Sequence, residues 1–119
     1  MNEIVGGDMT MRILQQAMSG LALRQRTIAD NLANIETPGF LAGKVDFEAA
    51  LKQALADGED PMATQVATAR SLEPTRVNGS NVNIDEETLA GQQTVLSTQL
   101  VSTALTNKFN NLKTSITGA

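Results

Sequence analysis

Apolar residues recur in alternating steps of three and four between Met11 and Ile35, and this periodicity constrains the fold more than any other feature of the sequence. Such spacing gathers the apolar side chains on one face of an α-helix and is the heptad pattern of a coiled coil. At 1.5 Å per residue the helix would be about 37 Å long, and its apolar face requires a partner. The polar Gln25 interrupts the repeat once. The other positions, named here the N-terminal stripe, are Met11, Leu14, Met18, Leu21, Ile28, Leu32 and Ile35.

A proline and a glycine mark where this helix stops. Pro38 disfavours helical backbone at Thr37, and Gly39 permits the positive φ of a tight turn. The helix is therefore predicted to end near Ile35. Phe40 follows the turn and is one of 3 phenylalanines in a sequence without tyrosine or tryptophan. Its ring is predicted to anchor the redirected chain.

A short helix is predicted next, from Asp46 to Leu55. Asp46 can accept hydrogen bonds from the first free amides of that helix. Phe47, Leu51 and Leu55 follow at spacings of four, so that their side chains stack on one face. This helix could fold back onto the long one.

Residues 59–80 lack a sustained period and are rich in Asp, Pro, Thr, Ala and Gly. This composition predicts a polar, largely irregular segment with too few large apolar side chains to bury much surface alone. A short strand pair around Asn78 and Gly79 remains a weakly indicated alternative.

A second long helix is predicted to follow. Asn83 or Asp85 can cap it, and Glu86 and Glu87 lie in its first turn, where negative charge favours the helix dipole. Its large apolar residues form a band that drifts round the helix rather than a strict heptad. They are Leu89, Leu96, Leu100, Leu105, Phe109, Leu112 and Ile116.

The predicted fold is all-α, with the two long terminal helices packed as an antiparallel coiled-coil hairpin and joined by a short helix and a polar, largely irregular middle segment. The expected division is a flexible N-terminus over 1–9, an N-terminal core helix over 10–36, a turn, short helix and irregular segment over 37–85, and a C-terminal core helix over 86–117.

The composition excludes most kinds of catalytic and metal-binding site. The 119-residue sequence has no cysteine and no histidine, which removes thiolate nucleophiles and the usual zinc, copper and haem ligands. An EF-hand reading of the segment from Asn81 fails because Glu86 stands where glycine is needed. We therefore predict no catalytic residue, no metal and no cofactor, and no small-molecule substrate.

Net charge, the first residues and the apolar helix faces indicate which partners and which export route to expect. Nine basic residues are dispersed among thirteen acidic ones, giving a net charge of −4, so nucleic acid is not expected as a partner. The first eight residues carry acid where a secretory signal has base, which predicts that any export proceeds without a cleavable signal peptide. Two helices that each keep an apolar face favour contacts between subunits, and head-to-tail contacts of this kind generate helical filaments.

The segment from Asn31 to Phe40 resembles the N-terminal signature of bacterial flagellar rod and hook proteins. Three further segments, 45–51, 81–87 and 108–113, are similar to one branch of that family, the proximal rod proteins of the basal body. Leu41 stands where a lysine is expected in that branch. The residues that match the family motif are Asn31, Asn34, Thr37, Pro38, Gly39 and Phe40.

The resemblance implies a non-enzymatic structural subunit of the proximal rod, which assembles helically through its terminal helices and transmits torque. It implies a place in the periplasm-spanning rod of the basal body, reached through the flagellar type III export apparatus. The implied partners are copies of the chain, other rod proteins, and the membrane-ring and export-gate base.

The expected subunit interface combines both helices and two aromatic anchors. Its residues are Met11, Leu14, Met18, Leu21, Ile28, Leu32, Ile35, Phe40, Phe47, Leu96, Leu100, Leu105, Phe109, Leu112 and Ile116. The alternative function is a small helical adaptor or export chaperone, which would share the apolar stripe and the acidic charge.

Overall fold

Two long helices and a small middle segment make up the molecule. The structure is a computed structural model that describes residues 2–118, with side chains from residue 9 onward. The elements in order are α1 (Asn2–Ala33), β1 (Gly43–Val45), α2 (Phe47–Ala56), the 3₁₀ turn η1 (Pro61–Ala63), β2 (Thr68–Arg70) and α3 (Ile84–Thr117).

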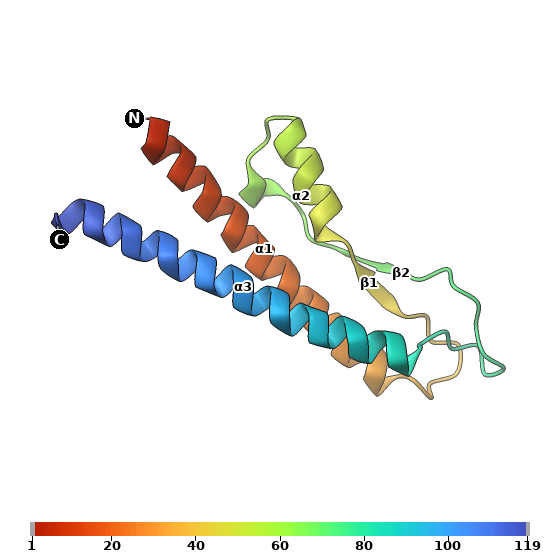
Figure 1. The fold of residues 1–119 in the computed structure, drawn as a ribbon. Coiled ribbons are helices and arrows are strands. Elements are labelled where there is room, and N and C mark those ends of the chain that lie inside the picture. The colour runs from red at the N-terminus through yellow and green to blue at the C-terminus, as the bar shows by residue number, and fades with distance from the viewer. Residues whose placement is uncertain (1, 119) are drawn as a thin grey trace.

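The two long helices lie side by side and run in opposite directions, so that both termini are at the same end (Figure 1). The middle segment covers one side of α1, and the helices separate towards the termini (Figure 1). The molecule extends 63 × 30 × 14 Å. A body this thin cannot enclose a large core, so much of its apolar surface stays outside. Among the described residues, no helix has both the length and the apolar character needed to cross a membrane.

Helix α1 begins at Asn2, earlier than expected, and therefore takes in most of the segment 1–9 that was predicted to be flexible. Gly6 and Gly7 each weaken a helix by about 1 kcal/mol, but adding residues to an existing helix is easy compared with nucleating one. Met1 lies outside the described residues. At the other end α1 stops at Ala33.

The predicted turn follows α1. The backbone N–H of Phe40 donates to the carbonyl oxygen of Thr37 at 3.2 Å, and Gly39 has a φ of +73°. Pro38 and Gly39 thus form the tight turn that the sequence predicts.

Helix α2 also forms where it was predicted. The Asp46 carboxylate accepts a hydrogen bond from the Ala49 N–H at 3.3 Å and caps the helix. Phe47 and Leu51 are buried against the rest of the chain, whereas Leu55 is exposed and Ala54 is buried in its place. Seven residues turn a helix almost two full times, so residue 54 returns to the face of Phe47 more closely than residue 55 does.

The chain is mostly helical, as the all-α prediction expects, but the middle segment contains a small two-stranded sheet that was not predicted. Strands β1 and β2 pair antiparallel, with Gly43 opposite Arg70, Lys44 opposite Ala69 and Val45 opposite Thr68. Strands of three residues are too short to display an alternating pattern, so nothing local revealed them.

The weakly indicated strand pair around Asn78 and Gly79 is not present among the described residues. A turn forms there instead, in which Arg76 N–H donates to Ser80 O at 2.7 Å and Gly79 N–H donates to Arg76 O at 2.9 Å.

The small apolar core lies between α1 and the middle segment. Leu21, Val45 and Phe47 are buried together, and Val66 and Val101 pack partly against them. Helix α3 thus contributes little large apolar surface to this core.

Helix α3 begins where one of the two candidate caps predicts. The Asn83 side-chain oxygen accepts hydrogen bonds from the N–H groups of Asp85 at 3.0 Å and Glu86 at 3.3 Å. Asn83, rather than Asp85, is therefore the N-cap.

Candidate assembly surface

A buried polar cluster joins α1, β1 and α3 at the end of the molecule farthest from the termini. We name Asn31, Gly43, Lys44 and Glu87 the polar junction. The Asn31 amide nitrogen donates to Gly43 O at 2.9 Å and to Glu87 Oε2 at 3.0 Å, and its oxygen accepts from Gly43 N–H at 2.8 Å. Lys44 Nζ lies 3.3 Å from Glu87 Oε1. Asn31 is 1% exposed and Glu87 2%, so these two side chains are shielded from water, whereas Lys44 is exposed.

Glu87 was expected to interact with the helix dipole, and the structure gives it a further, long-range role. Its carboxylate is taken up by Asn31, 56 residues earlier in the chain. Of the acidic residues in the first turn of α3, Glu87 is buried while Asp85 and Glu86 are exposed. No local pattern distinguishes the three, which is why sequence reasoning missed the junction.

A second buried asparagine holds the loops beside the junction. The Asn81 side-chain oxygen accepts from Ala42 N–H at 2.7 Å, and its amide nitrogen donates to the carbonyl oxygens of Ser71 and Glu73. Its backbone N–H donates to Phe40 O at 3.1 Å. In the sequence, Asn81 belongs to the segment 81–87 that resembles the rod proteins, and the structure shows that its side chain satisfies backbone groups of the loops.

The family-motif residues after Asn31 build the turn. Asn34 donates to Asp30 O at 2.8 Å and accepts from the Thr37 hydroxyl at 3.1 Å. The two turns of the molecule then meet, because Gly39 N–H donates to Asn78 O at 2.9 Å. A Cβ on Gly79 would lie 3.1 Å from Gly39 Cα, so a glycine suits this close approach.

Phe40 is half-buried next to these turns. The Arg70 guanidinium lies over its ring at 5.3 Å from the centroid and also donates to Leu41 O at 3.0 Å. The ring is thus covered on one face by the same chain.

Phe47 fixes α2 against α1 through a glycine that the sequence analysis passed over. A Cβ on Gly20 would lie 2.3 Å from the Phe47 ring, so only glycine leaves room for it. Arg24 completes the contact from the other side: its guanidinium lies 4.8 Å from the ring centroid, donates to Val45 O at 2.7 Å and pairs with Glu48 at 2.6 Å. Hydrogen bonds from Arg24 lower the pKa of the Glu48 carboxyl.

A further ion pair ties α1 to the 3₁₀ turn. Arg12 Nη1 lies 2.7 Å from Asp60 Oδ2. The pKa of Asp60 is lowered, mainly because its carboxylate accepts from the Met62 N–H and in part because Arg12 is beside it. Gln16 is buried nearby and donates to the Thr64 carbonyl oxygen.

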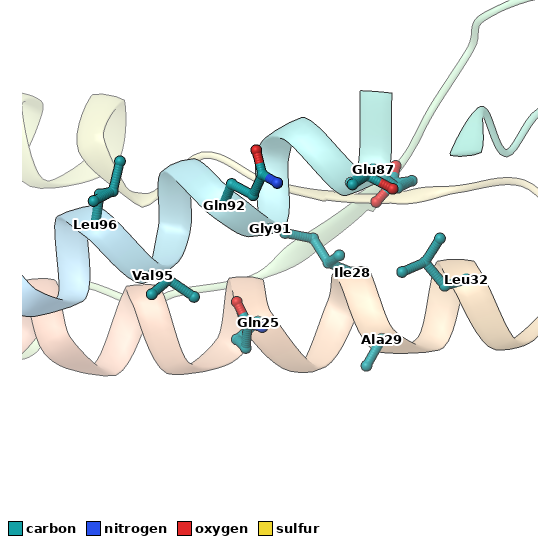
Figure 2. A pocket seen from close by; sticks show the side chains of 10 residues that line it. Gln25, Ile28, Ala29, Leu32, Glu87, Gly91, Gln92, Val95 and Leu96 are labelled. Atoms are coloured by element: carbon teal, nitrogen blue, oxygen red, sulfur yellow. The ribbon is translucent and has the colours of Figure 1, made fainter. Parts of the chain in front are cut away.

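An open apolar groove of about 640 Å³ runs along one flank of the two helices. Ile28, Ala29 and Leu32 of α1 line it opposite Gly91 and Val95 of α3 (Figure 2). Val95 points towards α1, whereas Leu96 points away from it (Figure 2). The groove therefore offers apolar surface that the chain does not cover itself.

The apolar band predicted on α3 divides into two patches. Leu89, Leu96 and Leu100 recur on one side and are all exposed, Leu100 by 73%; we name them the outer ridge. The next large residue, Leu105, comes five positions later, and five residues turn a helix by about 140° from the starting side. The second patch, named the distal stripe, is Leu105, Phe109, Leu112 and Ile116.

The distal stripe lies in the part of α3 where the two long helices separate (Figure 1). Leu105 is half-buried, whereas Phe109, Leu112 and Ile116 are exposed, Ile116 by 77%. Large apolar residues at helical spacing that stay exposed indicate a surface for association.

Charge is also unevenly distributed along α3. Asp85, Glu86 and Glu87 all lie in its first turn, and the only charged residues after them are Lys108 and Lys113. The long apolar and amide-rich stretch between them presents no charge that would have to be desolvated on contact.

The structure sorts the expected interface into three groups. Leu21, Ile28 and Phe47 are buried within the chain, so in this conformation they are not available to a neighbour. The half-buried group is Met11, Leu14, Met18, Leu32, Ile35, Phe40 and Leu105. The exposed group is Leu96, Leu100, Phe109, Leu112 and Ile116.

Comparisons with known proteins agree with the resemblance. A family model described as flagella basal body rod protein matches residues 11–40. The chain is 31% identical over 121 residues to the flagellar basal body rod protein FlgB of Bacillus subtilis, a match covering 92% of this chain and 94% of the relative. It is 28% identical over 113 residues to FlgB of Borreliella burgdorferi, covering 77% and 84%.

A shorter match joins the chain to FlgB of Escherichia coli, with 35% identity over 66 residues that cover 56% of this chain and 48% of the relative. The Bacillus subtilis match spans nearly the whole of both chains.

Proposed function

The chain belongs to the FlgB family of flagellar basal body rod proteins, and from this membership we propose that its long helices assemble with neighbouring subunits into the wall of the proximal rod. The chain is a structural subunit of the flagellar basal body and not an enzyme, and other rod components are its partners. What is proposed is how it makes those contacts and where.

The proposed contact surface is the exposed part of the two helices. The outer ridge and the distal stripe supply the largest exposed apolar side chains of α3, and the half-buried residues of the N-terminal stripe supply those of α1. The observation that carries the proposal is that six of the seven residues in these two patches are more than half exposed on a molecule 14 Å thick. Burying one such leucine or phenylalanine fully is worth about 1.5–3 kcal/mol.

The proposed packing between subunits is of the coiled-coil type. Both helices run along the 63 Å dimension of the molecule, and contacts repeated along them would resist slippage under torque. A contact that uses different surfaces on its two partners generates a helical array when the rotation does not close.

We also propose a more specific location within the basal body and an export route. The chain would stand in the periplasm-spanning part of the rod, next to the membrane-ring and export-gate base, after export without a cleavable signal peptide. These points rest on the resemblance of the two terminal motifs. The adaptor or export chaperone has no observation in its favour, because the relatives are rod proteins.

Leu100→Asp tests the contact surface, because residue 100 is exposed and a charge there leaves the core untouched. We expect the variant chain, as the sole copy in its bacterium, to be synthesised normally but to abolish rod assembly and motility. Gln99→Asp is the matched control, since it adds the same charge at the neighbouring exposed residue off the ridge. Normal motility of the Leu100→Asp strain would contradict the proposed surface.

Fractionation tests the location separately. The chain is expected in detergent-resistant basal bodies, and a soluble complex with a single client would instead support the adaptor.

A further inference from the structure

Helix α3 contacts α1 through residues that do not by themselves fix how far one helix is displaced along the other. The side of α3 that meets α1 and the middle segment carries the small residues Gly91, Thr94 and Ser97 with only two valines, Val95 and Val101, among them, while the outer ridge faces away. Small side chains form shallow ridges and grooves, so apolar packing favours no single alignment strongly.

The polar junction can fix this alignment of α3 along α1. We propose that Asn31 and Glu87 are positioning residues that set the register of α3 on α1, and thereby the relative placement of the apolar patches on the two helices. The inference stands on the described contacts and does not depend on the proposed function.

Both N–H donors and the oxygen of the Asn31 side chain are engaged in this one arrangement. An asparagine amide has two N–H donors and one acceptor oxygen. One N–H and the oxygen engage both backbone groups of Gly43, and the remaining N–H engages Glu87. An aspartate at position 31 has the same shape but would place oxygen against Gly43 O and against the Glu87 carboxylate.

Gly43 makes the approach possible because it has no side chain. A Cβ on Gly43 would lie 2.8 Å from Thr27 Cγ2 and 2.8 Å from Thr68 Cγ2. The backbone of β1 can therefore approach Asn31 closely. The next residue, Lys44, extends its ammonium group to the other oxygen of the Glu87 carboxylate.

A displacement of α3 by one helical turn would leave Glu87 buried without Asn31. A buried charge that loses its hydrogen-bond donors carries a large desolvation penalty, whereas sliding of small side chains past each other costs little. Fixing alignment in this way is the best-attested use of a buried polar group.

Disulfide trapping in the purified full chain measures the register, because the natural sequence contains no cysteine. The in-register pair is Ile28→Cys with Gly91→Cys, since a Cβ on Gly91 would lie 3.8 Å from Ile28 Cγ2. Two displaced pairs, Gln25→Cys or Leu32→Cys with Gly91→Cys, report sliding by about one turn in either direction. Under mild oxidation only the in-register pair should close in the parent background.

Isosteric substitutions then test the two positioning residues. Asn31→Asp should lose in-register disulfide and gain a displaced one. Glu87→Gln should shift the products the same way to a smaller extent, because it keeps an acceptor for Asn31 but removes the buried charge that resists displacement. The double variant Asn31→Asp with Glu87→Gln should recover part of the in-register product lost in Asn31→Asp, because the donor and acceptor are exchanged. Helicity by circular dichroism is followed in parallel. Asn110→Asp and Glu86→Gln are the matched controls at exposed sites.

Three outcomes would overturn the proposal. The in-register pair fails to close in the parent; Glu87→Gln and Asn31→Asp leave the pattern of disulfides unchanged; or the double variant shows no recovery beyond the single ones. Glu87→Gln keeps an acceptor for Asn31 and is the milder change, so it remains informative where Asn31→Asp unfolds the chain.

Discussion

The two ends of the same helix pair are built differently. Near the turns, α1 and α3 are joined through the polar junction and beside the buried Ile28. Near the termini the two helices separate (Figure 1), and Phe109, Leu112 and Ile116 of the distal stripe are exposed. The difference shows that self-contained structure and apolar surface for neighbours occupy separate parts of one helix. Substitutions at the two ends should therefore have opposite consequences for stability and for assembly.

Leu21→Asp should have the largest effect on stability, because residue 21 is 2% exposed in the core between α1 and the middle segment. Burying a carboxylate there should cost more than about 4 kcal/mol and unfold the chain. Urea denaturation followed by circular dichroism measures the loss. Ala22→Asp places the same charge on the adjacent exposed residue and should cost only about 1 kcal/mol, mostly through the lower helix propensity of aspartate. Equal effects of the two substitutions would show that Leu21 is not part of the core.

Two glycines in the helices should respond in opposite directions to alanine. Gly20→Ala puts a Cβ into the Phe47 ring and should cost about 1–3 kcal/mol by overpacking. Gly91→Ala meets only an ordinary contact at 3.8 Å and should stabilise by up to about 1 kcal/mol through helix propensity. Thermal unfolding of both variants checks the signs, and a stabilised Gly20→Ala chain would exclude the tight α1–α2 contact.

Glu48→Gln should have a smaller, pH-dependent effect. The pKa of the Glu48 carboxyl is lowered from its usual 4.5 by Arg24. A lowered folded-state pKa means that the ion pair stabilises the fold above the usual pKa, and that this stabilisation is lost as the pH falls through the lowered value. The carboxylate side chain is 54% exposed, so the effect is at most about 1 kcal/mol.

The measurement is the unfolding free energy of parent and variant as a function of pH. Their difference should be present at neutral pH and shrink in acid. A difference that grows in acid would show that Arg24 does not hold the ionised carboxylate.

Phe109→Ser should have the smallest effect on the isolated chain, because the ring is exposed in the distal stripe. We expect its unfolding free energy to change by less than about 0.5 kcal/mol. Rod assembly in cells should nevertheless be impaired. A large loss of stability would instead mean that the distal stripe is covered within the chain, and would weaken the contrast between the two ends.

Local signals carried the prediction of the elements. Asp46 and Asn83 cap the helices that follow them, and Gly39 turns the chain after Pro38, because capping and turn formation depend on neighbouring residues. The family motif was likewise visible as a contiguous segment.

Contacts between residues far apart in the chain could not be predicted from the sequence. Asn31 meets Glu87 across 56 positions and Val45 pairs with Thr68, and neither partner carries a distinctive local pattern. Helical spacing also could not tell which apolar residues the chain itself covers, so Leu21 and Leu100 looked equivalent although one is buried and the other exposed.

The arm between Ser71 and Ser80 has a consequence for how such chains can vary in length. Ser71 N–H donates to Ala42 O at 2.7 Å on one side, and Ser80 is fully buried on the other, while Leu72 and Val77 between them are fully exposed. Ser71 and the turn from Arg76 to Ser80 each have their own hydrogen bonds, which leaves residues 74–75 between two anchored points. Extra residues inserted after Glu73 would extend the arm into solvent at little entropic cost and leave both long helices undisturbed.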